Sequence, residues 1–150
     1  MTRFTTGFSD AAQMASRYLV EQVNGMRRSQ TFGLDSELRE ELGDVWSECQ
    51  TDNWDGYKAL PVSQDTLRQV YELLEELPDD FPAPSLSADP DGALALEWYT
   101  SKDRQISVSI IDGEIHYAAK LGSERHHGNY LLVDGWPKSL FSLIQKIAGR

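Results

Sequence analysis

The chain has 150 residues, of which 40% are hydrophobic and 25% are charged. This length and composition fit one folded domain with its own core and argue against a disordered chain. No apolar run approaches the ~20 residues of a membrane-spanning helix, and the amino-terminal residues lack the pattern of a secretion signal. The single cysteine, Cys49, excludes an intramolecular disulfide and fits a reducing compartment. We therefore expect a cytoplasmic, single-domain protein that does not associate with membranes.

The net charge of −10 is concentrated in the middle of the chain. Residues 35–98 hold seventeen acids and three bases (−14), whereas residues 1–34 (four bases, two acids) and 99–150 (seven bases, five acids) each carry +2. Such a segment repels nucleic-acid phosphates and anionic membranes, and it attracts basic proteins. Direct binding to nucleic acid is therefore not expected. The alternative interpretation of the acidic segment is a solvated surface that keeps the protein soluble.

Three helices are predicted in the first half of the chain from apolar residues at helical spacing. The first follows Ser9, a suitable N-cap, and ends at Gly25. The second opens at Leu34 and Asp35, with acids crowding its first turns, where the helix dipole favours them. The third begins near Ser63 and ends before Pro78. The apolar stripe of the second helix contains Leu38, Leu42, Val45, Trp46 and Cys49.

After Pro84 the apolar residues alternate with polar ones, which predicts strands over residues 94–98, 106–110 and 115–119. A fourth strand is expected at Ser85–Ala88, and Asp91-Gly92 and Asp112-Gly113 are turn signals. Residues 122–128 are predicted to form a solvent-facing loop, and residues 130–133 can add a short edge piece. A final helix starts at Pro137.

These elements predict an α+β fold in one domain, with a helical part over residues 1–50 and an αβββα-type core over residues 51–150. Its order is two N-terminal helices, a third helix, an antiparallel meander of about four strands and a C-terminal helix. We expect helices to cover one face of the sheet and to leave the other partly open.

The densest motif is Asn53-Trp54-Asp55-Gly56-Tyr57-Lys58-Ala59-Leu60-Pro61-Val62. Asp55 can accept hydrogen bonds from nearby backbone N–H groups while Gly56 takes a positive φ. In one interpretation, which we favour, Trp54 and Tyr57 point into the core. In the other, Trp54, Asp55 and Tyr57 form an exposed recognition loop, because aromatic residues dominate binding hot spots.

This motif and the later segment Pro90-Asp91-Gly92-Ala93-Leu94-Ala95-Leu96-Glu97-Trp98 together resemble a widespread family of small bacterial proteins. That family pairs an N-W-D-G-Y-x-A-x-P-V segment with a P-D-G-x-hydrophobic-x-L-E-W strand, and the resemblance covers about residues 53–117. It implies bacterial or mobile-element settings and a defence-related or toxin-neutralising role, without any specific chemistry. Lys58 departs from the family pattern, which commonly has Gly at this position.

Candidates for chemistry are few. The pair His126-His127, with His116 upstream, fits no common zinc-ligand spacing. Cys49 lies on an apolar stripe, where a free cysteine is usually a small hydrophobic residue. Motifs for acyl transfer and phosphate binding are absent from the sequence. Glu97 is predicted to face the open side of the sheet, where it can pair with Arg104 or Lys120 or anchor a basic partner. We predict no metal and no cofactor, and we favour a protein that is not an enzyme.

Three functional hypotheses follow. The leading one is a non-enzymatic, acidic protein that binds a basic, nucleic-acid-handling protein and inhibits or neutralises it, as immunity proteins, antitoxins and anti-defence inhibitors do. The second is a structural module that forms a homodimer through the open sheet face or an edge strand, using Tyr99, Ile111 and Trp136. The third is an enzyme that uses Glu97, Asp55 or the pair His126-His127. The residues predicted to contact a partner are Glu40, Glu41, Asp44, Trp54, Asp55, Tyr57, Glu75, Glu76, Asp79, Asp80 and Glu97.

Overall fold

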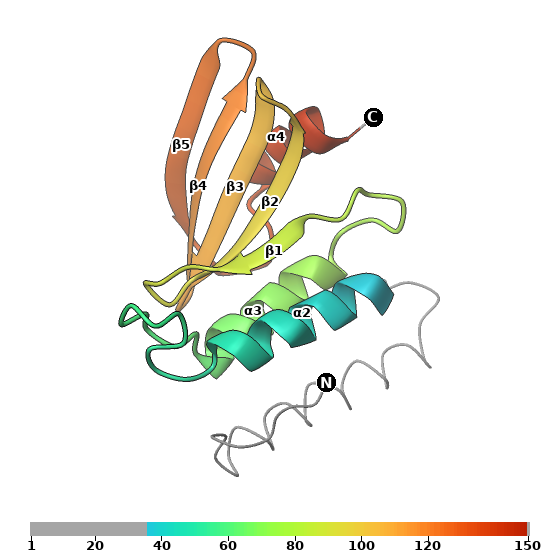
Figure 1. The fold of residues 1–150 in the computed structure, drawn as a ribbon. Coiled ribbons are helices and arrows are strands. Elements are labelled where there is room, and N and C mark those ends of the chain that lie inside the picture. Colours follow the sequence, from blue (N-terminus) through green and yellow to red (C-terminus); the bar gives the residue numbers. More distant parts are fainter. Residues whose placement is uncertain (1–35, 150) are drawn as a thin grey trace.

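The computed structural model describes residues 36–149, and it confirms the predicted α+β class (Figure 1). The first predicted helix, after Ser9, lies outside the described residues. Along the chain the elements are α2 (Ser36–Cys49), α3 (Gln64–Glu75), β1 (Ser85–Ala88), β2 (Leu94–Ser101), β3 (Arg104–Ile111), β4 (Glu114–Leu121), β5 (Glu124–Leu131) and α4 (Lys138–Ala148).

The five strands form one antiparallel sheet in the order β1-β2-β3-β4-β5, so each strand pairs with the next along the chain. The predicted Asp112-Gly113 turn joins β3 to β4. Both of its residues have positive φ, 46° and 86°. Such turns match the right-handed twist of a hairpin. This turn is attached to the start of α3, because the Asp112 backbone N–H donates to Oγ1 of the buried Thr66 at 3.0 Å.

The prediction of about four strands, with a loop over residues 122–128, is wrong at β5. Every residue of β5 is paired with β4, from Leu121↔Glu124 to Glu114↔Leu131. Because β5 is an edge strand, its side chains are exposed or half-buried, and it shows no strong apolar alternation. Backbone pairing to β4 makes this segment a strand, and a search for hydrophobic periodicity misses it.

The three described helices pack on one face of the sheet. Helix α2 contacts β1, whereas α3 and α4 contact β2 and β3. Along β2, Leu94, Leu96 and Trp98 are buried, and Glu97 and Tyr99 are exposed on the other face. One hydrophobic cluster joins side chains from all three helices and from β1 to β4, so α2 is part of this domain. No helix within residues 36–149 is long and apolar enough to cross a membrane.

The start of α3 agrees with the sequence prediction. Ser63 is its N-cap, and its side chain accepts a hydrogen bond from the Thr66 backbone N–H at 3.1 Å. Helix α4 likewise follows directly after Pro137. These boundaries are local features of the chain, since caps and prolines act within one turn of the helix that they delimit.

Candidate protein-interaction surfaces

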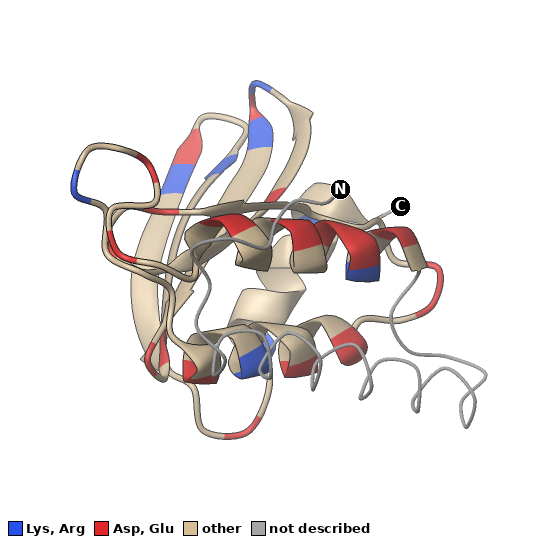
Figure 2. Cartoon of the chain, turned by 60° about the horizontal axis from the view of Figure 1, so that its bottom comes forward, with Lys and Arg blue, Asp and Glu red and all other residues tan. Residues whose placement is uncertain are grey.

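The outward side of α2 carries a row of acids (Figure 2). Leu38, Leu42, Trp46 and Cys49 are buried against the sheet and α3. Glu40, Asp44 and Glu48 are exposed on the opposite side and follow one another at a spacing of four residues. We call these three residues the α2 acidic stripe. None of them takes part in an ion pair within residues 36–149. Their carboxylates are therefore exposed and are not used in ion pairs by the described part of the fold.

Glu41, also predicted as a partner contact, has a structural role. Its Oε2 accepts a hydrogen bond from the Leu86 backbone N–H at 3.1 Å. Leu86 lies in β1, which is the other edge strand of the sheet. Glu41 thus satisfies a backbone donor at an edge that would otherwise be open.

The acids at the end of α3 differ from one another in their contacts. Glu75 is half-buried, and this burial raises the pKa of its carboxyl group. A hydrogen bond from Tyr71 opposes this rise in pKa, and the nearby charge of Glu72 adds to it. Glu76 is exposed, and its Oε1 accepts a hydrogen bond from the Trp136 backbone N–H at 3.3 Å. Asp79 and Asp80 are exposed in the loop that follows. The predicted set of four acids is therefore split between contacts within the fold and solvent.

In the loop of residues 53–60, one of the two aromatic side chains packs on the core and the other is exposed. Trp54 is half-buried against the core, and its indole N–H donates to the Leu60 carbonyl at 2.8 Å. Tyr57 is 87% exposed. The structural interpretation is therefore correct for Trp54 and wrong for Tyr57. The two side chains differ in burial because Trp54 can bury part of its ring while its N–H group keeps a hydrogen-bond acceptor, whereas Tyr57 lies at the tip of the loop.

This loop is held in one conformation by its own side chains. Oδ1 of Asp55 accepts hydrogen bonds from the backbone N–H groups of Tyr57 (2.7 Å) and Ala59 (3.1 Å), and Oδ1 of Asn53 accepts one from Lys58 at 2.6 Å. Asn53, Gly56 and Lys58 have φ of 58°, 80° and 68°. Lys58 thus occupies a left-handed conformation that favours glycine.

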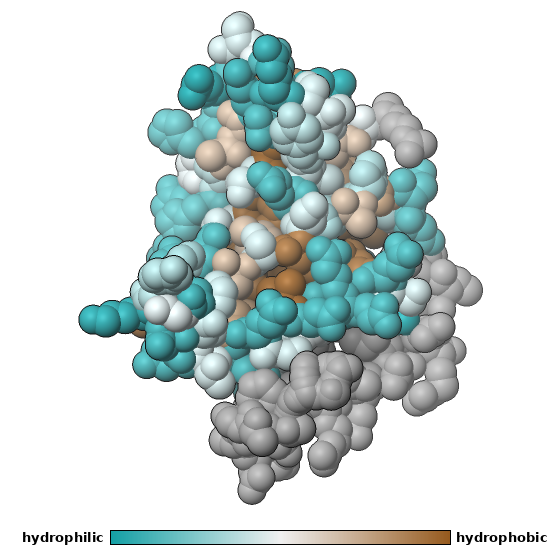
Figure 3. All heavy atoms as spheres, viewed as in Figure 1, coloured by the Kyte–Doolittle hydropathy of each residue, from teal (hydrophilic) through white to brown (hydrophobic). Residues whose placement is uncertain are grey.

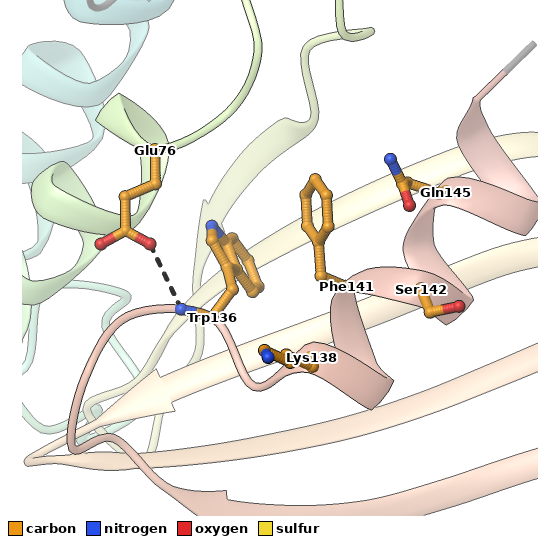
Figure 4. A pocket seen from close by; sticks show the side chains of 6 residues that line it. All are labelled: Glu76, Trp136, Lys138, Phe141, Ser142 and Gln145. Carbon is orange, nitrogen blue, oxygen red and sulfur yellow. Dashed lines mark hydrogen bonds between the residues drawn. The ribbon is translucent and has the colours of Figure 1, made fainter.

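A pocket that the sequence did not predict lies between the end of α3 and the start of α4 (Figure 4). Its lining combines Glu76 with side chains that lie some sixty residues later, and no local pattern connects these two segments. The clearest sequence signal is the aromatic residue directly before Pro137, the residue that precedes the final helix: Trp136. The lining residues are Glu76, Trp136, Lys138, Phe141, Ser142 and Gln145.

The residues of the enzyme hypothesis are not brought together. Glu97 and His127 lie in one row of the sheet, on β2 and β5, and are separated by three strand spacings, ~14 Å. Asp55 lies in the loop between α2 and α3. Among residues 36–149 no group of three His, Cys, Asp or Glu could hold a metal ion. Cys49 is 1% exposed, and burial raises the pKa of its thiol to about 12, so it is not a thiolate nucleophile at neutral pH.

Lys120 and Arg104, the two bases considered as partners of Glu97, contact other residues. Lys120 pairs with Asp103 at 3.1 Å, and the Arg104 guanidinium donates to the Lys146 carbonyl. Glu97 itself is exposed and stands opposite Ser107 in the ladder. Of the two possibilities for Glu97, the ion pair with Arg104 or Lys120 is not formed within residues 36–149, and the carboxylate is exposed to solvent.

The residues of the homodimer hypothesis also differ in exposure. Tyr99 is 64% exposed, but Ile111 and Trp136 are half-buried, and the Trp136 indole N–H donates to the Leu73 carbonyl at 2.8 Å. Trp136 therefore belongs to the packed side of the molecule, and the prediction of an exposed Trp136 is wrong. On the sheet face turned away from α4, hydrophilic residues surround a hydrophobic central area (Figure 3).

The two segments of the family resemblance meet in space. The Leu60 backbone N–H donates to the Pro90 carbonyl at 2.8 Å, and a Cβ at Gly92 would lie 3.4 Å from the Pro61 carbonyl oxygen. The two motifs are therefore in direct contact in this fold. Comparisons with protein-family models, with curated proteins and with solved structures each find no match to this chain.

Proposed function

We propose that this chain binds a basic protein through the α2 acidic stripe and thereby inhibits or neutralises it. The observation that supports this most is the exposure of Glu40, Asp44 and Glu48 on the side of α2 opposite its buried residues. Like charges four residues apart on a helix destabilise it. The stability of the fold therefore does not account for this row, whereas recognition of a basic surface does.

The chemistry of the surface suggests the class of partner. Proteins that handle nucleic acid carry clustered Lys and Arg side chains that contact phosphates. A rigid helix with three acids competes for the same side chains and blocks access to the phosphate backbone. The resemblance to a bacterial family with an implied toxin-neutralising role supports the same proposal.

The test has two stages. The tagged full-length chain is first used to capture a basic protein from its host lysate at low and moderate salt, with identification by mass spectrometry. The affinity of the purified pair is then measured for the wild type and for Glu40→Lys/Asp44→Lys/Glu48→Lys. We expect this variant to lose about 100-fold in affinity, because each reversal replaces an attraction by a repulsion.

A matched control distinguishes the effect of the α2 acidic stripe on affinity from the effect of the net charge of the chain. The variant Glu114→Lys/Glu124→Lys/Asp134→Lys makes the same change in net charge at exposed positions on or after β4 and β5. We expect it to lose at most about threefold in affinity, since screening weakens distant charges. Equal losses in the two variants, or unchanged affinity in the stripe variant, would contradict the proposal.

A homodimer is the second candidate, and exposed apolar residues near the β5 edge favour it. Leu131 ends β5 with 71% exposure, and Val133 is 84% exposed. An eight-residue edge strand leaves backbone groups that a second copy can pair with. If the edge is an interface, sedimentation should show a dimer at micromolar concentrations, and Leu131→Lys/Val133→Lys should dissociate it. A monomeric wild type across this range would reject the dimer.

A further inference from the structure

The pocket between α3 and α4 has an aromatic wall and an acidic side. It is open to solvent and has a volume of about 250 Å³, which is enough for one long side chain. The rings of Trp136 and Phe141 have centroids 6.4 Å apart. Figure 4 shows Trp136 between Glu76 and Phe141, with Lys138 below them. A ligand in the pocket would therefore meet two aromatic rings and one carboxylate.

Both rings are held in place by the fold. The Trp136 indole donates to the Leu73 carbonyl at 2.8 Å, and its ring contacts buried Trp98 at a centroid distance of 6.3 Å. Phe141 packs on Phe81 with ring centroids 5.6 Å apart. Because the fold itself supplies these contacts, binding here does not need to order the aromatic wall.

The charges around the pocket favour a cation. The carboxylate of Glu76 lies over Gly135, whose missing Cβ leaves room for it. Glu76 is also the C-cap of α3, so the negative end of this helix adds to its charge. Residues 72–80 contain five acids and no Lys or Arg. Lys138 is the one base among the lining residues, and it opposes a cation from one side.

We infer that this pocket receives an arginine side chain of the basic partner, an inference that rests on the proposed function. A planar guanidinium can stack on the Trp136 ring and donate two hydrogen bonds to the Glu76 carboxylate. The aliphatic part of the same side chain can pack against Phe141. A phosphate or carboxylate ligand would gain from Lys138 but would face Glu76 and the negative faces of both rings.

The experiment uses the full chain and a small probe, so it does not depend on finding the partner. N-acetyl-arginine amide is titrated at low salt while the Trp136 indole N–H is followed by ¹⁵N NMR. We expect a saturable shift with a Kd of about 1–10 mM, which is reasonable for one side chain. The neutral citrulline analogue has nearly the same shape and should give no saturable shift at this N–H.

Three variants test the charges. Glu76→Gln should weaken binding of the arginine probe about fivefold or more, because it removes the charged acceptor. Lys138→Gln should tighten binding about twofold to threefold, because it removes a repulsive charge. Asp80→Asn is the matched control, since it removes one acid from the same segment outside the pocket; its Kd should stay within about twofold of the wild type.

The results that overturn the inference are equal shifts with the arginine and citrulline probes, no shift with either, or weaker binding after Lys138→Gln. Failure here is distinguishable from failure of the proposed function. If the probe does not bind but the stripe variant still loses its protein partner, the pocket assignment alone is wrong. If the probe binds and charge reversal on α2 leaves partner affinity unchanged, the proposed stripe is wrong instead.

Discussion

The acids of α2 and the acids at the end of α3 look alike in the sequence but differ in what they contact. Glu40, Asp44 and Glu48 on α2 face solvent, and no ion pair within the described chain involves them. At the end of α3, Glu75 is half-buried, and Glu76 accepts a hydrogen bond from the Trp136 backbone N–H in the loop before α4. A count of charges therefore locates an acidic segment without showing which acids are available to a partner.

The largest effect should come from the contacts that hold the end of α3 against α4. Trp136→Ala removes the hydrogen bond to Leu73 and the ring contacts with Trp98 and Phe141. We expect a loss of about 3 kcal/mol in the free energy of unfolding, measured in urea. Tyr57→Ala is the comparison, because that ring is 87% exposed; a similar loss there would contradict the described loop.

A smaller contrast separates two neighbouring acids of α2. Glu41→Ala leaves the Leu86 backbone N–H without its acceptor, so we expect a loss of about 1 kcal/mol. Glu40→Ala should change stability by no more than about 0.3 kcal/mol. Both variants lose one acid from the same helix, and urea unfolding of the pair compares them directly. Equal stability of the two would mean that Glu41 is as solvent-facing as the stripe.

Glu75 should reveal its burial through pH. Its raised pKa means that the folded chain holds this proton more tightly than the unfolded chain does. The corresponding stability is complete below the ordinary glutamate pKa and is lost as the pH rises through the raised value. Glu75→Gln removes this loss, so at pH 7 it should be more stable than the wild type, by less than about 1 kcal/mol because the group is partly exposed.

The same comparison at pH 4 should show the advantage of Glu75→Gln shrinking toward zero. Asp79→Asn is the control, because Asp79 is exposed in the loop after α3, and its difference from the wild type should not follow the same course. An advantage of Glu75→Gln that is the same at both pH values would show that packing, and not the charge, is responsible.

The smallest effect concerns the α2 acidic stripe itself. Neutralising it with Glu40→Gln/Asp44→Asn/Glu48→Gln removes repulsion between charges four residues apart, and it should raise stability by about 0.5 kcal/mol at low salt. The gain should shrink as salt is added, because exposed charges are screened. A loss of stability at low salt would indicate that these acids make stabilising contacts, and it would weaken the case for a binding surface.

Predictions from sequence succeeded where the signal is local. The apolar stripes of α2 and α3, the Ser63 cap and the Asp112-Gly113 turn each depend on residues within one turn or one hairpin, and all are present. The prediction failed at β5, because an edge strand of polar residues carries little hydrophobic periodicity. It also failed for Tyr57, since an aromatic residue is equally compatible with a core and with a rigid, exposed loop tip.

The sequence by itself determined the class of fold, the starts of α3 and α4 and the concentration of negative charge between residues 35 and 98. These properties follow from composition and from short-range periodicity, which need no knowledge of distant segments. Only the tertiary structure determined which acids make hydrogen bonds within the fold and which are exposed to solvent. Glu41 meets Leu86 and Glu76 meets Trp136, forty-five and sixty residues apart, and such contacts exist only after distant elements pack on one sheet.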